Sequence, residues 1–155
     1  MAHPKFLIAP AALHVDAPDQ ETARAVLDAF LQAASVEAGR IRWEPYTKLG
    51  PHSRLSFYAL IPDADEDAAI IGEIDRICTC LVGANGLTRG HTIDFVTDGG
   101  DRHYERIFSR HVDHEGSFFF PQTHWFHIEL DLYTPIQKRL RKFWREDRAA
   151  AKGES

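Results

Sequence analysis

In Lys48-Leu49-Gly50-Pro51-His52-Ser53-Arg54 the chain turns between two segments that have the composition of β-strands. The pair Gly50-Pro51 is typical of a turn, because glycine tolerates a positive φ while proline fixes its own φ and lacks an N–H donor. The flanking runs, residues 41–46 and 55–61, are rich in the aromatic and branched residues that suit a half-buried sheet. The stretch therefore predicts a β-hairpin with His52 at its tip.

The segments around this hairpin alternate regularly between strand and helix patterns. Residues 6–15 have a strand pattern, and an amphipathic helix pattern follows over 23–34, with Asp16 as its predicted cap. A second apolar stripe covers 70–81, and another strand pattern covers 91–96. The order β-α-β-β-α-β predicts an α+β, ferredoxin-like fold, with an antiparallel sheet in the spatial order 4-1-3-2 and both helices on one face.

We expect one domain over the whole chain, with 1–98 as the ferredoxin-like core and 99–155 as a C-terminal extension. Helical spacing of apolar residues predicts an extra helix over 101–110, and strict alternation predicts an added strand over 124–133. Thr134 then opens a basic amphipathic helix. That helix is expected to pack on the acidic body or on a second copy of the chain, which makes a homodimer one predicted arrangement.

The bulk composition narrows the class of protein. With 155 residues, 44% apolar and 26% charged, the chain is an ordinary globular domain, and no run approaches the roughly 20 apolar residues of a membrane span. We therefore expect a cytoplasmic protein without a membrane partner. Residues 1–133 hold 11 Lys and Arg against 20 Asp and Glu, a charge of −9, which disfavours nucleic acid. Cys78 and Cys80 point about 200° apart on a helix, so they are predicted to be reduced.

Three histidines carry the predicted site. In the expected topology His14 ends the first strand, His52 lies in the hairpin and His91 opens the fourth strand, so all three gather at one end of the sheet. Asp16 lies two residues from His14 and can add a carboxylate. Imidazoles with a carboxylate suit Fe(II) or another divalent metal, and open positions could hold a substrate. The competing interpretation is that this cluster of histidines has no function, because nine histidines in 155 residues will often fall at loops and strand ends.

The motifs around these histidines resemble a known family. The run Leu13-His14-Val15-Asp16 ahead of a helix, then Gly50-Pro51-His52, then Asn85-Gly86-Leu87 ahead of His91, is similar to the DOPA 4,5-dioxygenase family over roughly residues 6–98. That family has a small ferredoxin-like domain with histidines at similar points. The resemblance implies a non-haem iron enzyme that opens a catechol-type ring by extradiol cleavage, with the three histidines around the metal or the substrate.

A secondary set of metal-capable residues lies in the extension. It consists of His111, His114, His127 and Glu129. An H-x-x-H pair in a loop is a weak signal, and a polar strand face is usually the solvated side of an antiparallel sheet. The sequence contains no nucleotide-binding loop and no G-x-S-x-G nucleophile motif.

Two classes of function therefore stay open. The first is a metal-dependent enzyme acting on a small aromatic substrate. The second is a non-catalytic acidic interaction domain, such as a regulator or an immunity-type protein, that binds a basic protein partner. Because ferredoxin-like folds support both, the geometry of the site has to distinguish them.

Overall fold

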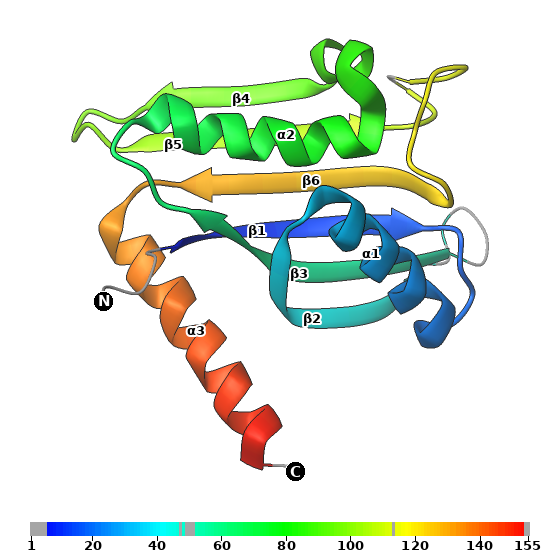
Figure 1. Ribbon diagram of the computed structural model, residues 1–155, viewed down its shortest axis with the longest axis horizontal. Coiled ribbons are helices and arrows are strands. Elements are labelled where there is room, and N and C mark those ends of the chain that lie inside the picture. Colours follow the sequence, from blue (N-terminus) through cyan, green and yellow to red (C-terminus); the bar gives the residue numbers. More distant parts are fainter. Residues whose placement is uncertain (1–5, 47, 49–51, 113, 154–155) are drawn as a thin grey trace.

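The computed structural model describes residues 6–46, 48, 52–112 and 114–153. Six strands form one antiparallel sheet in the spatial order β2-β3-β1-β6-β5-β4, which gives an α+β fold with three α-helices (Figure 1). The elements are β1 (Phe6–Val15), α1 (Gln20–Ala34), β2 (Glu37–Tyr46), β3 (His52–Pro62), α2 (Asp67–Gly86), the short 3-10 helix η1 (Leu87–Arg89), β4 (His91–Val96), β5 (Arg102–Ser109), β6 (Thr123–Asp131) and α3 (Thr134–Gly153).

Helices α1 and α2 cover one face of the sheet, and the core lies between them and the strands (Figure 1). Alternate residues of the central strands point into this core because successive strand residues face opposite sides. Its largest fully buried side chains include Phe30, Phe108 and Phe126. Each buried phenylalanine contributes about 2–3 kcal/mol relative to exposure. The other side of the sheet, which we call the open face, is not covered by α1 or α2.

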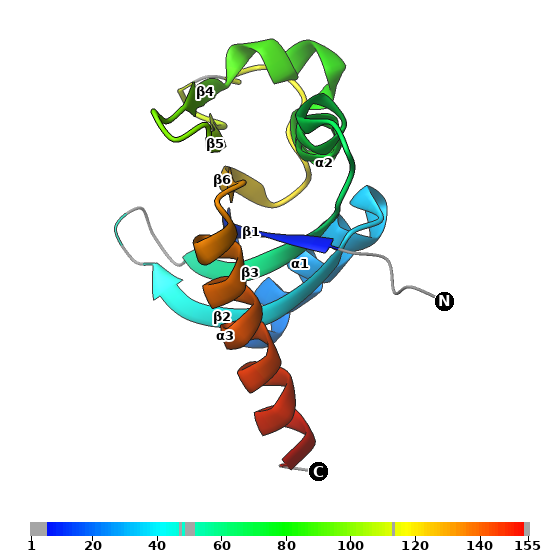
Figure 2. The same cartoon turned by 90° about the vertical axis from the view of Figure 1, so that its left-hand side faces the viewer.

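Helix α3 begins just after β6 ends and runs past β1 and β2, where its Asp147 pairs with Arg42 (Figure 2). The Gln137 side chain accepts a hydrogen bond from Ile8 N and donates one to Ile8 O, beyond the point where β6 pairs with β1. Further along, the Trp144 ring meets Phe6 edge-on at 5.2 Å. The predicted C-terminal helix is therefore confirmed, and it packs on the start of β1. In the described part of the chain, no helix combines the length and the apolar character needed to cross a bilayer.

Helix α1 begins differently from the sequence prediction. Asp19, not Asp16, is its N-cap, and its carboxylate accepts a hydrogen bond from Thr22 N at 2.8 Å. The helix ends at Ala34, where Ser35 adopts a left-handed conformation and its N–H bonds back into the last turn. Asp16 is consequently left outside the helix, in the loop that follows β1.

The hairpin prediction holds for the described residues. Strands β2 and β3 pair antiparallel, with Tyr46 opposite His52, while residues 49–51 of the predicted turn lie outside the described part. His52 is the first residue of β3. Next to it, buried Ser53 accepts a hydrogen bond from Trp43 Nε1 and donates one to Ala17 O.

The predicted strand order is wrong at one edge. Strand β4 lies at the edge of the sheet, beside β5, and β6 takes the place next to β1 that 4-1-3-2 gives to the fourth strand. All six residues of β4 are exposed, whereas β6 contributes fully buried Phe126, Ile128 and Leu130. A central position buries the inner face of a strand, so the more apolar strand occupies it.

The extra helix predicted over 101–110 is also wrong, because this segment is strand β5. Its helix-facing residues are Tyr104, Arg106 and Phe108, which are all buried. The apolar spacing that suggested a helix combined Tyr104 and Phe108 with Ile107, whose side chain lies on the other face.

The two cysteines are free, as predicted, and burial raises the pKa of the Cys78 thiol.

Candidate metal centre

Three metal-capable side chains meet where β1 ends and β3 and β6 begin. Asp16 follows β1, His52 opens β3 and His124 is the second residue of β6. An Asp16 carboxylate oxygen lies 3.0 Å from His52 Nδ1 and 3.4 Å from His124 Nε2. One ligand atom from each residue lies within 4.8 Å of the other two. We call these three residues the Asp16 site.

The spacing of these atoms matches that of ligands around one ion. Nitrogen and oxygen ligands bind zinc-sized ions at about 2.1 Å, so two ligands separated by 90–109° lie roughly 3.0–3.4 Å apart. The two measured distances fall at the ends of that interval. The Nε2 atom of His124 is also buried without a hydrogen-bond partner among the described residues. The donor set therefore fits a divalent metal ion.

Hydrogen bonds to the backbone of the Asp16 loop hold it at this site from two sides. Asp16 N–H donates to Gln122 O at 2.7 Å, which joins the loop to the segment entering β6. Gln122 has a φ of 65°, so the chain turns sharply just before His124. On the other side, Ala17 O accepts the Ser53 hydroxyl at 2.7 Å. The three ligand positions are thus held by β1, β3 and β6 together.

His14 lies beside this site between two aromatic rings. Its ring centroid is 4.5 Å from those of Tyr46 and Trp125, and 5.9 Å from that of His124. Burial lowers the pKa of His14 to about 4, and the positive charges of His124 and Arg54 act in the same direction. His14 is therefore neutral near pH 7. Its Nε2 atom is buried and has no hydrogen-bond partner among the described residues.

Two further side chains lie around the Asp16 site. Arg110 Nη1 reaches within 3.9 Å of the second Asp16 carboxylate oxygen and so places a positive charge beside that carboxylate. His111 lies with its ring 6.3 Å from that of His124 and is exposed. Burial lowers the pKa of His124, with Asp16 opposing the shift. A neutral imidazole is the form that binds a metal.

The structure brings His14 and His52 together as predicted, but not His91. In the sheet register His91 faces Ile107, Ile107 faces His127, and His127 faces Ala12. Three strand spacings of about 4.8 Å therefore place His91 roughly 14 Å from β1. His124 takes the expected place of His91, because β6 and not β4 lies beside β1. The only sequence signal for His124 was its position at the start of a predicted strand.

The four residues of the predicted secondary metal site lie in three different parts of the structure. His111 lies near the Asp16 site. His114 is fully buried, bonds to Gly86 O at 2.8 Å and packs near Phe108 and Phe119, which makes it a core residue. His127 and Glu129 lie further along β6, on its open face. These four residues do not form one metal site.

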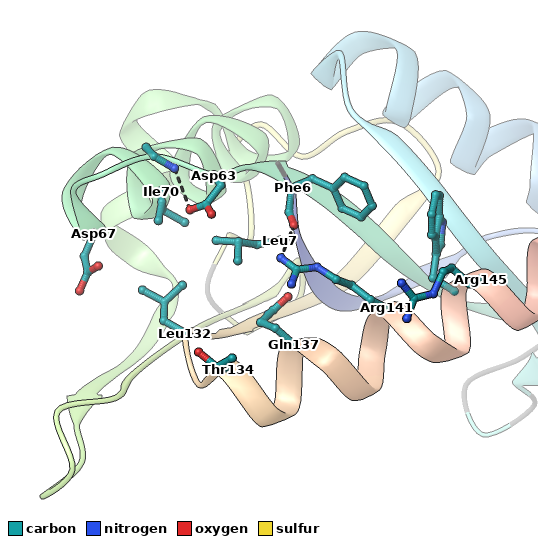
Figure 3. Close-up of a pocket in the computed structure, with 12 residues that line it drawn as sticks. Phe6, Leu7, Asp63, Asp67, Ile70, Leu132, Thr134, Gln137, Arg141 and Arg145 are labelled. Atoms are coloured by element: carbon teal, nitrogen blue, oxygen red, sulfur yellow. Dashed lines mark hydrogen bonds between the residues drawn. The ribbon is translucent and has the colours of Figure 1, made fainter. Parts of the chain in front are cut away.

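An open cavity lies at the opposite end of β1 from the Asp16 site. It measures about 680 Å³, is open to solvent and is lined by the start of β1, the start of α2, and α3 (Figure 3). Its lining combines apolar Phe6 and Ile70 with the charged side chains of Asp63 and Arg141, and none of its described lining residues is a histidine. Arg141 donates to Phe6 O at 2.7 Å within it. This cavity is separate from the candidate metal centre.

The Asp16 site has the composition of a facial triad. Two imidazoles and one carboxylate leave coordination positions open, an arrangement used by non-haem Fe(II) oxygenases and by catalytic zinc sites. Comparison of the chain with protein-family models, with curated proteins and with solved structures gives no match.

Proposed function

We propose that the protein is a metal-dependent enzyme in which Asp16, His52 and His124 bind Fe(II) or another divalent ion. The observation that carries this proposal is the spacing of their ligand atoms, at 3.0 Å and 3.4 Å from Asp16 to the two imidazoles. The proposed substrate is a small aromatic molecule of the catechol type. Extradiol ring opening, the activity implied by the resemblance to the DOPA 4,5-dioxygenase family, is the specific reaction we propose.

The residues around the Asp16 site have roles that suit such a substrate. A bound ion would supply Lewis acidity and, for iron, redox chemistry. His14 is neutral, and its buried Nε2 has no hydrogen-bond partner among the described residues, so it can accept a hydrogen bond from a phenolic hydroxyl. The rings of Tyr46 and Trp125 flank His14 and can orient an aromatic ring by stacking. Arg110 lies 3.9 Å from the second Asp16 oxygen and can hold that carboxylate in position.

Metal titration tests the proposal. In protein without a histidine tag, titrated anaerobically with Fe(II), we expect His52→Ala and His124→Ala each to weaken binding on the order of 100-fold or more, since a lost ligand costs more than a lost outer contact. The matched control is His91→Ala, an exposed histidine on β4 that should leave binding unchanged. Equal Fe(II) affinity in the wild type and in both ligand variants would remove the proposal.

Measurements of turnover distinguish residues that bind the metal from residues that act on the substrate. Oxygen uptake with a panel of catechols should depend on added Fe(II) and disappear in His124→Ala. His14→Phe, which keeps a ring between Tyr46 and Trp125 but removes the acceptor nitrogen, should retain Fe(II) and lower kcat/KM for catechols. A His14→Phe enzyme with wild-type kcat/KM would exclude His14 as the acceptor of the phenolic hydroxyl.

A second candidate function, an interaction domain, is favoured by strand β4. This edge strand exposes Ile93 (42%), Phe95 (50%) and Val96 (60%) and has one edge facing no other described strand. Such an edge can pair with a strand of another chain. The candidate would become the preferred one if the tag-free protein bound no metal and Phe95→Lys abolished self-association or binding to a basic protein.

A further inference from the structure

A second group of histidines and carboxylates lies on the open face of β5 and β6. Its members are His103, Glu105, His127, Glu129 and Asp131. In the sheet register His103 lies opposite Asp131, and Glu105 lies opposite Glu129. The side chains of His103 and Glu105 are only 14% and 17% exposed. The Phe95 ring stacks on His103 at 5.0 Å, which shields one side of the group.

We propose that His103, Glu105 and Glu129 bind a second divalent cation. One ligand atom from each lies within 4.8 Å of the other two. His103 Nε2 lies 3.0 Å from a Glu105 carboxylate oxygen, again the separation expected of two ligands on one ion. We call these three residues the Glu105 site. Along β6, Glu129 is five residues from His124, or roughly 17 Å, so the two sites hold separate ions.

Outer contacts already orient the ligands of the Glu105 site. Asp131 lies 2.6 Å from His103 Nδ1, so it can accept the proton on that nitrogen and leave Nε2 facing Glu105. This carboxylate–histidine arrangement is the usual support of a metal-binding imidazole. The His127 ring contacts the other Glu105 oxygen and fixes that carboxylate from the opposite side.

The charges of the group also call for a cation. Three carboxylates meet two imidazoles, so the group is negative whether or not the imidazoles are protonated. Glu105 and Glu129 lie directly opposite each other on neighbouring strands, where like charges destabilise a sheet. A divalent ion between them would turn this repulsion into attraction. Because two of the three ligands are carboxylates, Mn²⁺ is the natural probe ion.

This inference does not rest on the proposed function, and one experiment keeps them apart. Mn²⁺ is titrated into tag-free His52→Ala protein, which lacks the Asp16 site, and free Mn²⁺ is followed by electron paramagnetic resonance. We expect one Mn²⁺ per chain, and we expect that ion to be lost when Glu129→Gln is added. The control Glu37→Gln removes an exposed carboxylate on β2 and should retain the ion.

A folding measurement guards against a collapsed variant. Glutamine keeps the shape of Glu129 and removes its charge, so metal-free Glu129→Gln should unfold at the same or a higher temperature than its parent, and Mn²⁺ should no longer raise that temperature. Absence of bound Mn²⁺ in the His52→Ala parent, or equal uptake after Glu129→Gln, would overturn the second site. A lower unfolding temperature of the metal-free variant would contradict the charge argument.

Discussion

Strand β6 contributes one residue to each of two histidine–carboxylate sites, His124 to the Asp16 site and Glu129 to the Glu105 site, and the two sites are built in different ways. The Asp16 site takes one residue each from positions 16, 52 and 124, at the ends of three strands. The Glu105 site takes its residues from two neighbouring strands, at positions that face one another in the sheet register. The first depends on loops that meet at one end of the sheet. The second depends only on the pairing of β5 with β6.

The two sites also differ in their net charge when no metal ion is bound. In the Asp16 site one carboxylate lies between two imidazoles with Arg110 nearby, so the arrangement is nearly balanced. In the Glu105 site carboxylates outnumber imidazoles, and Glu129 lies opposite another carboxylate. We therefore expect the Asp16 site to be preformed, and the Glu105 site to gain more stability from its ion.

The strongest test of this comparison removes the support that both sites share. Phe126 is fully buried on β6 between them, with its ring 5.5 Å from Phe30. Phe126→Ala should lower the free energy of unfolding by about 3–5 kcal/mol, because it leaves a cavity in the core. Urea denaturation of the metal-free protein measures it. Val112→Ala, at a side chain that is 76% exposed, should change stability by less than about 0.5 kcal/mol.

Metal affinities of the Phe126→Ala variant then show whether β6 supports both sites or only one. If β6 is a common support, both the Fe(II) site and the Mn²⁺ site weaken together in this variant. Weakening of only one would show that the other is held by its remaining strands.

Local patterns predicted the half of the sheet from β2 to β1. The turn residues at 50–51 and the strand patterns around them specify the pairing of β2 with β3, and the expected topology places β1 on the other side of β3, as observed. From the same patterns, His14 and His52 were placed at one end of the sheet. Their proximity depends on the pairing of β1 with β3, which the β-α-β-β order and its usual topology predict.

The other half of the sheet depends on which of two strands distant in sequence pairs with β1, and the pattern of a single sequence does not reveal that choice. Both 91–96 and 124–133 are strand-like, but only β6 brings three fully buried apolar residues to the place beside β1. That choice moved His91 away and brought His124 in. Asp16 was misassigned for a related reason, because Asp16 and Asp19 are both suitable helix caps and only the observed fold shows which one serves.

A smaller effect is expected from the outer contact of the Glu105 site. Asp131→Asn replaces the carboxylate that lies 2.6 Å from His103 Nδ1. It should weaken Mn²⁺ binding at that site by roughly 10-fold, the lower end for a lost outer contact, and leave Fe(II) binding at the Asp16 site unchanged. Parallel titrations with the two ions measure both. Asp98→Asn, at an exposed residue after β4, is the matched control. An equal loss at both sites would mean that the two groups are coupled through β6.

The smallest effect tests which aspartate caps α1 and which is free to bind metal. Asp19→Ala removes the acceptor of the Thr22 N–H and should lower the unfolding temperature, whereas Asp19→Ser, which can still cap, should restore most of it. The hydrogen bond from Thr22 lowers the pKa of the Asp19 carboxyl below its ordinary 3.8, so the folded state favours the ionised form. The stabilisation is therefore present above pH 3.8 and is lost as the pH falls through the lower folded value.

The measurement is the difference in unfolding temperature between the wild type and Asp19→Ala, taken near neutral pH and again at a pH of about 2, where it should shrink. Fe(II) binding at the Asp16 site should be unchanged in Asp19→Ala, since Asp19 lies outside that site. If Asp19→Ala left the helix intact while Asp16→Ala unfolded it in metal-free protein, Asp16 would be the cap. A carboxylate engaged by the first turn of α1 would then be unable to face His52 and His124, and the Asp16 site would lose its only oxygen ligand.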